Sequence, residues 1–377
     1  MAAIDWITIE GFRSIACIKR LRLRPINVLI GANGSGKSNF IGAFSFLNAV
    51  RLGRLRNYVL RAGGAERILH FGSRNTSLIR AHISFENERN RYEIELSSDE
   101  SDGLFPSREA VFFWDKSQHP TPYSKSLAPY QGEARISAPE PQYGVAAYVQ
   151  GHLDSWRLFH FHDTSTNSPM KKTADVHDNR RLRSNGSNLA SYLYFLREKH
   201  YQSYELIRRT IRLAAPFFQD FHLEPQVLNE DKIRLEWRHL GSDAYFDSSS
   251  LSDGTLRFMA LATLLLQPSD YQPSAIVMDE PELGLHPVAI TLLASLVRQA
   301  SATTQIILAT QSSLLLDHFS PEDVLIADRK NGQTELTRLK SEELQDWLDD
   351  YSLGQLWEKN EFGGRPASEN GGRAVSP

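Results

Sequence analysis

A glycine-rich run stands close to the start of the chain, Gly31-Ala32-Asn33-Gly34-Ser35-Gly36-Lys37-Ser38. It follows the apolar run Ile26–Ile30 and leads into helix-compatible sequence from Lys37 to Leu52. The pattern G-x-x-x-x-G-K-S between a strand and a helix predicts a phosphate-binding loop. Its glycines let the backbone curl so that successive N–H groups point at one anion, and the positive end of the following helix adds to that field.

The positions of this loop have distinct predicted roles. Lys37 is expected to reach the β- and γ-phosphates of ATP, and Ser38 is expected to ligate Mg²⁺. The other nucleotide-binding candidates are Asn33, Gly34, Ser35 and Gly36. The alternative is a Gly/Ser turn that matches by chance, which the flanking strand and helix disfavour.

The composition is that of a globular protein of 377 residues, long enough for two domains or for one domain with a large insertion. A formal net charge of −3 does not indicate a nucleic-acid partner, although it is compatible with a local basic patch. The single cysteine, Cys17, excludes an intramolecular disulfide. Neither the first residues nor the longest apolar runs have the pattern of a signal peptide or a membrane span, so we expect a cytoplasmic protein without membrane association.

A second apolar run, Ala275–Met278, ends in the adjacent acids Asp279 and Glu280. A buried parallel strand that delivers carboxylates at its C-terminal end is where an α/β fold places chemistry. We expect Asp279 to hold Mg²⁺ and Glu280 to act as the catalytic carboxylate that orients or deprotonates the attacking water. The alternative is a strand that ends in solvated acids.

Two further turns belong to the same prediction. Leu251–Thr255 precedes an apolar helix, and its Ser252 and Gly254 form a candidate anion site at the start of that helix. The apolar strand Gln305–Ala309 ends at Thr310-Gln311-Ser312, where Gln311 is a second catalytic candidate that senses the γ-phosphate or orients water.

The middle of the chain has a mixed pattern. Gly144–Val149 and Trp156–Phe161 are interpreted as strands, with Gln150 between them as a weak candidate for a Mg²⁺ contact. His160, His162 and Asp163 are candidate metal ligands, although satisfied polar residues near the nucleotide site are the favoured interpretation. The following helices are predicted over Leu189–His200 and Tyr204–Ala215.

The remaining elements complete a predicted α/β core with a mixed sheet. Half-exposed strands are expected over Ile4–Glu10, Ile18–Leu23, Ser77–Phe85 and Arg91–Leu96, closing strands over Asp323–Asp328 and Thr334–Leu339, and a helix over Ser341–Trp357. The predicted division is an N-terminal lobe at 1–84, an inserted α+β lid or arm domain at 85–225, a C-terminal lobe at 226–360 and a disordered tail at 361–377. No heptad pattern is long enough for a coiled-coil arm.

These motifs together resemble the ABC-type ATPases, in particular the RecF/SMC/OLD-like branch of AAA-type predicted ATPases. The similarity includes Gly11-Phe12-Arg13-Ser14 and Gly284-Leu285-His286-Pro287 besides the motifs above. The resemblance implies a P-loop ATPase that forms a homodimer by sandwiching two ATP molecules. One subunit would contribute Lys37, Ser38, Asp279 and Glu280 to each site, and the other would contribute Ser252 and Gly254.

The chain also departs from this pattern. Many members have histidine where this chain has Gln311, which predicts slow hydrolysis because glutamine cannot carry a charge. Asp253 replaces the glycine that is usual in transporters, and an acid near a γ-phosphate is unfavourable unless it points away. No Toprim-like acidic constellation follows Pro287, so we expect no nuclease within this chain.

Three functions follow as hypotheses. The first is a Mg²⁺-dependent ATPase that acts on DNA or controls a separately encoded nuclease or toxin effector, in repair or anti-phage defence. The second is a slow, ATP-loaded scaffold that sequesters a partner protein. The third, a transporter subunit, is disfavoured by the large insertion. DNA contact is a prediction from two basic stretches, Arg51–Arg67 and Lys171–Arg183.

Overall fold

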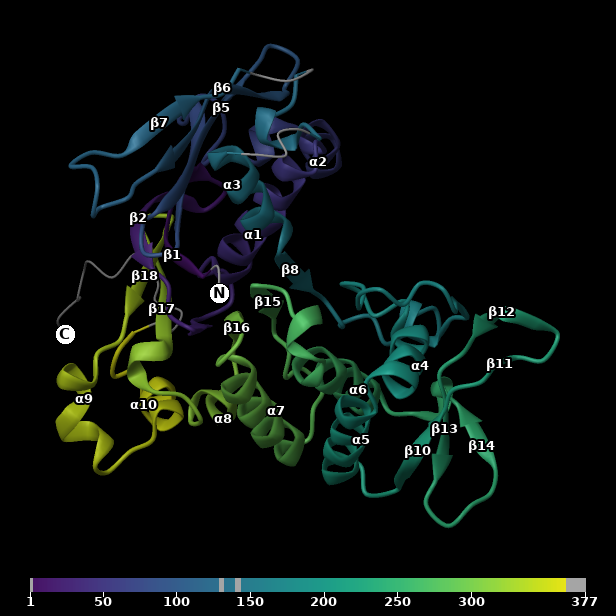
Figure 1. Cartoon of the computed structure of the whole chain (residues 1–377). Coiled ribbons are helices and arrows are strands. Elements are labelled where there is room, and N and C mark those ends of the chain that lie inside the picture. The colour runs from purple at the N-terminus through teal and green to yellow at the C-terminus, as the bar shows by residue number, and fades with distance from the viewer. Residues whose placement is uncertain (1–2, 129–131, 140–143, 364–377) are drawn as a thin grey trace. The chain divides into compact units, whose positions relative to one another are not determined.

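A computed structural model describes residues 3–128, 132–139 and 144–363 (Figure 1). The chain divides into two compact units, each described by itself below. The first comprises Met1–Trp156 and Ser320–Pro377, and the second comprises Arg157–Phe319. The predicted insertion at 85–225 is therefore divided between both units, and the division into lobes and lid stays a prediction. Residues 364–377 of the predicted disordered tail lie outside the described residues.

An antiparallel sheet forms much of the first unit. Its strands lie in the order β2-β1-β4-β5-β6-β7. Their bounds are β1 Ile4–Phe12, β2 Ile15–Arg22, β4 Leu78–Phe85, β5 Asn90–Ser98, β6 Leu104–Phe113 and β7 Tyr123–Ser126. Side chains alternate between buried and partly exposed along β4 and β5, so one face of this sheet packs on a core and the other is partly solvated.

A second set of strands in the first unit carries the phosphate loop. β17 (Val324–Lys330) pairs in parallel with β3 (Ile26–Ile30), with Val324 opposite Val28, and antiparallel with β18 (Gln333–Arg338). All five residues of β3 are buried, as expected for an inner strand. The chain leaves β3 through the loop and enters α1 (Lys37–Arg51), so the predicted strand, loop and helix are confirmed.

The other helices of the first unit include two corrections. Their bounds are α2 Leu55–Ala62, α3 Val145–Asp154, α9 Ser341–Leu348, α10 Leu353–Lys359, and the 3-10 turns η1 Ala65–Arg67, η2 Arg135–Ser137 and η6 Pro321–Asp323. The predicted strand at Gly144–Val149 is wrong, because this segment is the start of α3, whose buried residues recur at helical spacing and pack against β5 and β6. The single helix predicted over Ser341–Trp357 is wrong as well, because Ser352 begins a new helix with a capping box to Gln355.

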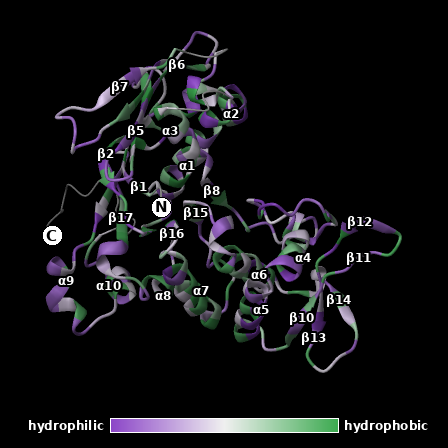
Figure 2. Ribbon diagram, in the orientation of Figure 1, coloured by the Kyte–Doolittle hydropathy of each residue, from purple (hydrophilic) through white to green (hydrophobic). Residues whose placement is uncertain are grey.

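The second unit contains the acidic strand. β15 (Ala275–Asp279) pairs in parallel with β16 (Gln305–Thr310), and β8 (Trp156–Phe159) follows β15 in the sheet order. The helices of this unit are α4 Leu189–Lys199, α5 Tyr201–Ala214, α6 Asp253–Leu266, α7 Pro287–Ala300 and α8 Ser313–Leu316. Figure 2 colours α7 mostly as hydrophobic residues, and α6 is buried from Leu256 to Leu266. The predicted strands at 275–280 and 305–309 are confirmed.

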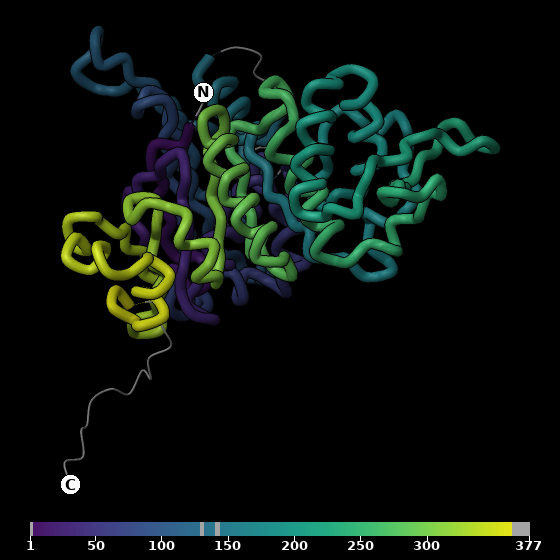
Figure 3. The backbone as a smooth tube through the Cα atoms, turned by 90° about the horizontal axis from the view of Figure 1, so that it is seen from below, coloured from purple at the N-terminus to yellow at the C-terminus, as the bar shows by residue number. Residues whose placement is uncertain are grey.

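Two small sheets complete the second unit. One has the order β10-β13-β14 (Phe218–His222, Glu236–His239, Tyr245–Asp247), and the other has the order β11-β12-β9 (Pro225–Gln226, Asn229–Ile233, Ala174–Asp175). The 3-10 turns are η3 Pro169–Lys171, η4 Ser248–Ser250 and η5 Ser269–Tyr271. Figures 1 and 3 show the β11–β12 hairpin extending away from the rest of this unit, with Val227 and Leu228 exposed at its tip.

Two kinds of long helix are absent from the described residues. In that part of the chain, no helix combines the length and the apolar character that crossing a bilayer demands. Its longest helix is α1, with 15 residues, so the described residues contain no long coiled coil.

Candidate nucleotide site

The predicted site residues fall into two groups, one in each unit, and each group is described by itself. The first is the phosphate loop, where Gly34 and Gly36 have φ angles of 81° and 103°, values that favour glycine. A Cβ atom at Gly36 would lie 1.8 Å from Thr334 Oγ1, so any other residue there would clash with the Thr334 side chain. No side chain of the described residues caps α1. The N–H groups of its first turn therefore remain available to the loop and to an anion bound there.

Lys37 lies across this loop with its side chain buried. The residue is 5% exposed, and its Nζ atom donates to the carbonyl oxygens of Gly31 and Ala32 at 2.6 and 3.0 Å. Ser35 Oγ is also buried and has no hydrogen-bond partner among the described residues. Asn33, Gly34 and Ser38 are exposed. The cationic Lys37 beside an exposed loop fits a triphosphate group, and the buried Ser35 hydroxyl fits an additional acceptor or donor, since buried polar groups normally have partners.

A hydroxyl network holds the phosphate loop from the side of β18. Thr334 Oγ1 donates to the Ser35 carbonyl at 3.0 Å and lies 2.7 Å from Ser14 Oγ, which in turn accepts from Asn39 Nδ2 at 2.6 Å. Thr334 is buried, with 1% of its surface exposed. This role of Thr334 could not be predicted, because no local pattern around it indicates contact with a loop about 300 residues away.

The second part of the site is the end of β15. Asp279 Oδ1 is buried and accepts no hydrogen bond from any described residue, which suits a carboxylate that ligates a metal ion. Glu280 follows with φ 42°, a left-handed conformation that is uncommon for a residue with a side chain. Its N–H donates to the Ala309 carbonyl at 2.8 Å, so the strained residue is anchored to β16.

The end of β16 meets these acids directly. Gln311 Nε2 donates to Glu280 Oε1, so the two predicted catalytic side chains are in contact. Thr310 Oγ1 donates to Glu282 Oε1, which also accepts from the Gln311 N–H at 3.4 Å. Burial raises the pKa of the Glu282 carboxyl, and the hydrogen bonds from Thr310 and Gln311 oppose that rise. Glu282 Oε1 therefore joins the two strand ends, while Glu282 Oε2 is buried without a hydrogen-bond partner among the described residues.

Replacing Gln311 with alanine is expected to slow ATP turnover by about tenfold while ATP affinity is unchanged, because the carboxylate of Glu280 loses the donor that orients it. The measurement is kcat and the ATP dissociation constant of Gln311→Ala beside Gln299→Ala, a glutamine on the exposed side of α7. An unchanged kcat would show that the orientation of Glu280 does not depend on Gln311.

The predicted anion turn lies at the start of α6. Ser252 Oγ caps the helix by accepting from the Thr255 N–H at 3.2 Å, and both Ser252 and Asp253 are exposed. A Cβ atom at Gly254 would lie 2.2 Å from the Gly284 carbonyl oxygen, so this turn packs directly on the loop that follows the acidic strand. The close approach explains why position 254 needs glycine.

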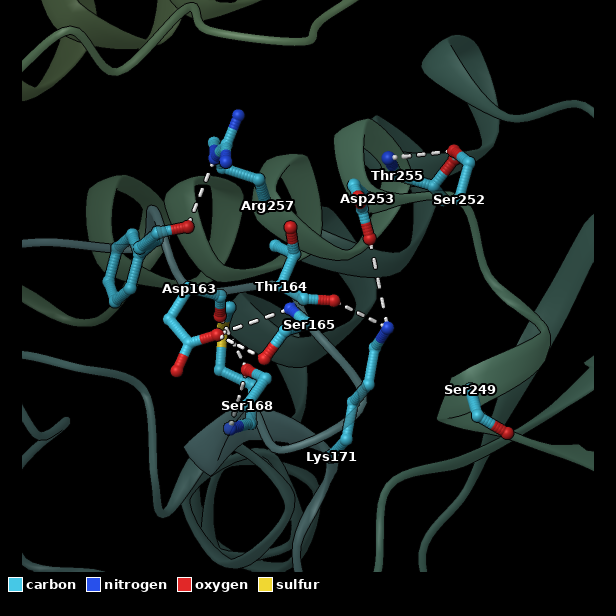
Figure 4. Close-up of polar contacts among 12 residues, drawn as sticks. Asp163, Thr164, Ser165, Ser168, Lys171, Ser249, Ser252, Asp253, Thr255 and Arg257 are labelled. Carbon is cyan, nitrogen blue, oxygen red and sulfur yellow. Dashed lines mark hydrogen bonds and ion pairs between the residues drawn. The ribbon is translucent and has the colours of Figure 1, made fainter.

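Arg257 is a buried residue of this region that the sequence did not single out. It is 5% exposed, and its guanidinium donates to the carbonyl oxygens of Phe161 and His162 at 3.0 and 3.1 Å. Figure 4 shows Arg257 on the helix that begins at the Ser252 turn. Burial lowers its pKa. Arg257 lines a small pocket together with Asp279 and Glu280, so it links the helix of the anion turn to the acidic strand end.

The weaker candidates of the middle segment have other surroundings. Gln150 lies within α3, where its Nε2 donates to the carbonyl oxygens of Ile136 and Ala138 at 3.0 and 2.9 Å, so the predicted loop contact with Mg²⁺ is wrong. His160 and His162 are exposed. Over residues 3–128, 132–139 and 144–363, no group of three or more His, Cys, Asp or Glu side chains is arranged to hold a metal ion.

Lys37 and Ser38 thus belong to the first unit, and Asp279, Glu280 and the Ser252 turn belong to the second. A family model described as "AAA domain, putative AbiEii toxin, Type IV TA system" matches residues 26–317, which include both parts. The chain belongs to this AAA-domain family. Membership confirms the predicted resemblance to AAA-type, RecF/SMC-like ATPases.

Two curated relatives match over shorter stretches. Urease accessory protein 2 of Cryptococcus neoformans var. grubii is 32% identical over 108 residues, which are 28% of this chain and 8% of that protein. Chromosome partition protein Smc of Mycobacterium tuberculosis is 33% identical over 101 residues, 26% of this chain and 7% of that protein. The AAA-domain chain therefore matches less than a tenth of the length of either relative.

Two solved structures match a larger share of the chain than these relatives do. An SMC head bound to the C-winged helix domain of ScpA has a TM-score of 0.62 at 16% identity, with 91% of this chain and 99% of that chain covered. An SMC head from Pyrococcus furiosus with an extended coiled coil, bound to the C-terminal domain of ScpA, has a TM-score of 0.58 at 15% identity and covers 93% and 99%. The mixed α/β fold of this AAA-domain protein is thus that of SMC-head ATPase domains.

Proposed function

We propose that this AAA-domain protein binds ATP with Mg²⁺ and hydrolyses it. The observation that carries the proposal is the contact between Glu280 and Gln311 beside Asp279, whose buried oxygen has no partner among the described residues. Such a group at the end of a parallel strand is suited to a metal ion and an attacking water. The phosphate loop with Lys37 supplies the complementary cationic half.

Each residue has a defined task in this proposal. Lys37 and the amides of the loop would hold the phosphates, and Ser38 and Asp279 would hold Mg²⁺, which neutralises charge on the phosphate oxygens when bound. Glu280 would accept the proton of the attacking water, with its carboxylate held in place by Gln311. The positive φ of Glu280 turns its side chain away from the direction of a regular strand. This left-handed backbone conformation is higher in energy, and the hydrogen bond from the Glu280 N–H to Ala309 helps to offset that energy.

A second copy of the chain would complete each site. The Ser252 hydroxyl and the backbone at Gly254 lie at the exposed start of α6, so they are available to an anion presented by another subunit. Dimers that form with ATP and separate after hydrolysis are the expected behaviour. Sedimentation velocity with ATP, with ADP and without nucleotide tests it, and the same sedimentation coefficient in all three would contradict the two-copy site.

The dimerisation cycle is proposed to act on DNA or on a separately encoded effector such as a nuclease or toxin. The family description, which names a toxin of a toxin–antitoxin system, and the similarity to a chromosome partition protein support a role of this kind. Repair and anti-phage defence are the settings that we propose for it, in the cytoplasm and without a membrane.

DNA contact is proposed for α2, where Arg56 and Arg61 are exposed. Arg51 is less suited, because it is paired with Asp154 at 2.7 Å. Replacing Arg56 and Arg61 with glutamine is expected to weaken binding to duplex DNA and to lower the log–log salt slope by about 2, one unit for each lost phosphate contact. Arg209→Gln, an exposed arginine of α5, is the matched control. Equal affinity and slope in the double variant would remove α2 from the DNA interface.

A slow scaffold that sequesters a partner protein is the second candidate. The neutral Gln311 beside Glu280 favours it, because an amide cannot add a positive charge to the transition state. Single-turnover hydrolysis with and without duplex DNA separates the two candidates. Strong stimulation by DNA supports the active cycle, and a slow rate that DNA does not change supports the scaffold.

A further inference from the structure

The turn before α6 carries a negative charge next to the groups proposed to meet an anion. Asp253 is the first residue of α6, it follows the capping Ser252, and its side chain is 67% exposed. A carboxylate at a helix N-terminus stabilises that helix. The same carboxylate repels a phosphate that approaches the turn. Compensation of the Asp253 charge would therefore favour binding of a nucleotide phosphate at this turn.

Lys171 supplies a compensating charge from a distant part of the sequence. Its side chain is only 9% exposed, and its Nζ atom lies 3.7 Å from Asp253 Oδ1. The same ammonium donates to the Thr164 carbonyl oxygen at 2.6 Å. Figure 4 shows the Lys171 side chain extending between these two oxygens. A lysine side chain that is mostly buried, with one hydrogen bond to a carbonyl oxygen and one ion pair, is more restricted in position than a lysine on a free surface.

The segment that carries Lys171 is itself fixed by short-range hydrogen bonds. Asp163 Oδ1 accepts from the Ser165 hydroxyl at 2.7 Å, and Ser168 Oγ donates to the Asp163 carbonyl oxygen at 2.5 Å. The Lys171 N–H donates to the Ser168 carbonyl oxygen at 3.0 Å, which closes the turn η3. This network places the lysine before any ligand is bound, as positioning residues require.

We propose that Lys171 is a positioning residue of the two-copy ATP site: it neutralises Asp253 and holds the Ser252–Gly254 turn ready for the nucleotide of the other subunit. The inference rests on the proposed function. It also assigns Lys171 to the turn, rather than to the DNA-contacting stretch in which the sequence placed it. Asp253 then serves the helix through its charge without repelling the partner's phosphates, because the ion pair is neutral as a whole.

The test measures ATP-dependent self-association in a Glu280→Gln background, in which the dimer is expected to persist. Lys171→Met is expected to weaken association by about tenfold, which corresponds to ~1.4 kcal/mol. The defect shrinks as salt rises from about 0.1 M to 1 M, because the exposed carboxylate is screened. Lys172→Met, an exposed neighbour, is the control. ATP binding to the monomer, read with a fluorescent ATP analogue, is expected to stay the same in all variants.

A charge-compensated double variant excludes a merely structural role. Lys171→Met with Asp253→Asn is expected to recover association to within about threefold of the background, since no net charge is left in the turn. A defect that persists in the double variant, or that does not depend on salt, would overturn the inference in favour of a loss of loop structure. Equal association of the Lys171→Met and Lys172→Met proteins would overturn the role of Lys171 but not the two-copy function. A Glu280→Gln protein that binds ATP but stays monomeric would overturn the two-copy function and this inference together.

Discussion

Replacing Lys37 with alanine is expected to abolish ATP turnover and to raise the ATP dissociation constant by about 100-fold, or ~3 kcal/mol, because the triphosphate loses charge-assisted hydrogen bonds. Lys37 is buried and donates to the carbonyl oxygens of Gly31 and Ala32, so its ammonium is held within the loop. When a triphosphate occupies the loop, the same ammonium is the nearest cation that we expect to reach it. The measurement is equilibrium binding of a fluorescent ATP analogue, with turnover assayed beside it.

Loss of the two carbonyl contacts also affects the folded protein, so the stability of the variant has to be measured. The thermal midpoint without nucleotide serves this purpose, and Lys19→Ala, an exposed lysine of β2, is the matched control. The Lys37→Ala protein is expected to fold and to lose the rise in thermal midpoint that ATP gives the control. Unimpaired ATP binding in a folded Lys37→Ala protein would show that Gly31–Ser38 is not the nucleotide loop.

Replacing Glu280 with glutamine is expected to lower kcat by about 10²- to 10³-fold while ATP binding is retained, because the amide cannot accept the proton of the attacking water. The substitution nearly preserves the shape of the side chain. Glu280 already contacts Gln311 through one oxygen, and an amide oxygen at the same place still accepts that bond. ATP should therefore be bound and not consumed, and the ATP-dependent dimer should accumulate.

The control for this prediction is Glu224→Gln, which neutralises an acid of the same unit whose side chain is 68% exposed. It is expected to hydrolyse ATP at the unaltered rate. A Glu280→Gln protein with normal turnover would reject Glu280 as the catalytic carboxylate. Asp279 and Glu282 would then be the remaining acids of the strand end, and Glu282 is engaged by Thr310 through Oε1 alone.

The sequence predicted those parts of the fold in which local patterns agree with the final packing. β3, the phosphate loop and α1 follow one another within a short stretch, and each has its own signal: an apolar run, glycines and helical periodicity. Prediction failed at Gly144–Val149, where a short apolar run fits a strand and a helix equally well. Tertiary packing of α3 on β5 and β6 stabilises the helical conformation of this segment. The helix break at Ser352 was readable, because Ser352 and Gln355 form a capping box.

In the candidate site too, local sequence patterns did not reveal the contacts that only tertiary packing forms. Motifs revealed Lys37, Asp279 and Glu280, because their chemistry demands particular residue types next to a strand end. Arg257 carries no local signal: its acceptors are backbone carbonyl oxygens at Phe161 and His162, which any residue provides. The pairing of Lys171 with Asp253 joins residues 82 positions apart, and only the folded chain brings them together.

The most direct test of the two-copy ATP site mixes inactive variants. Subunits with Lys37→Ala have no intact site when they pair with each other, and the same is true of subunits with Ser252→Arg. A mixed dimer, however, contains one complete site if Lys37 and Glu280 act in one subunit and Ser252 acts from the other. An equal mixture is therefore expected to regain ATP turnover that neither variant has alone, since each mixed dimer has one complete site of two. A mixture of Lys37→Ala and Glu280→Gln should regain nothing. Turnover restored in that second mixture and absent from the first would contradict the account.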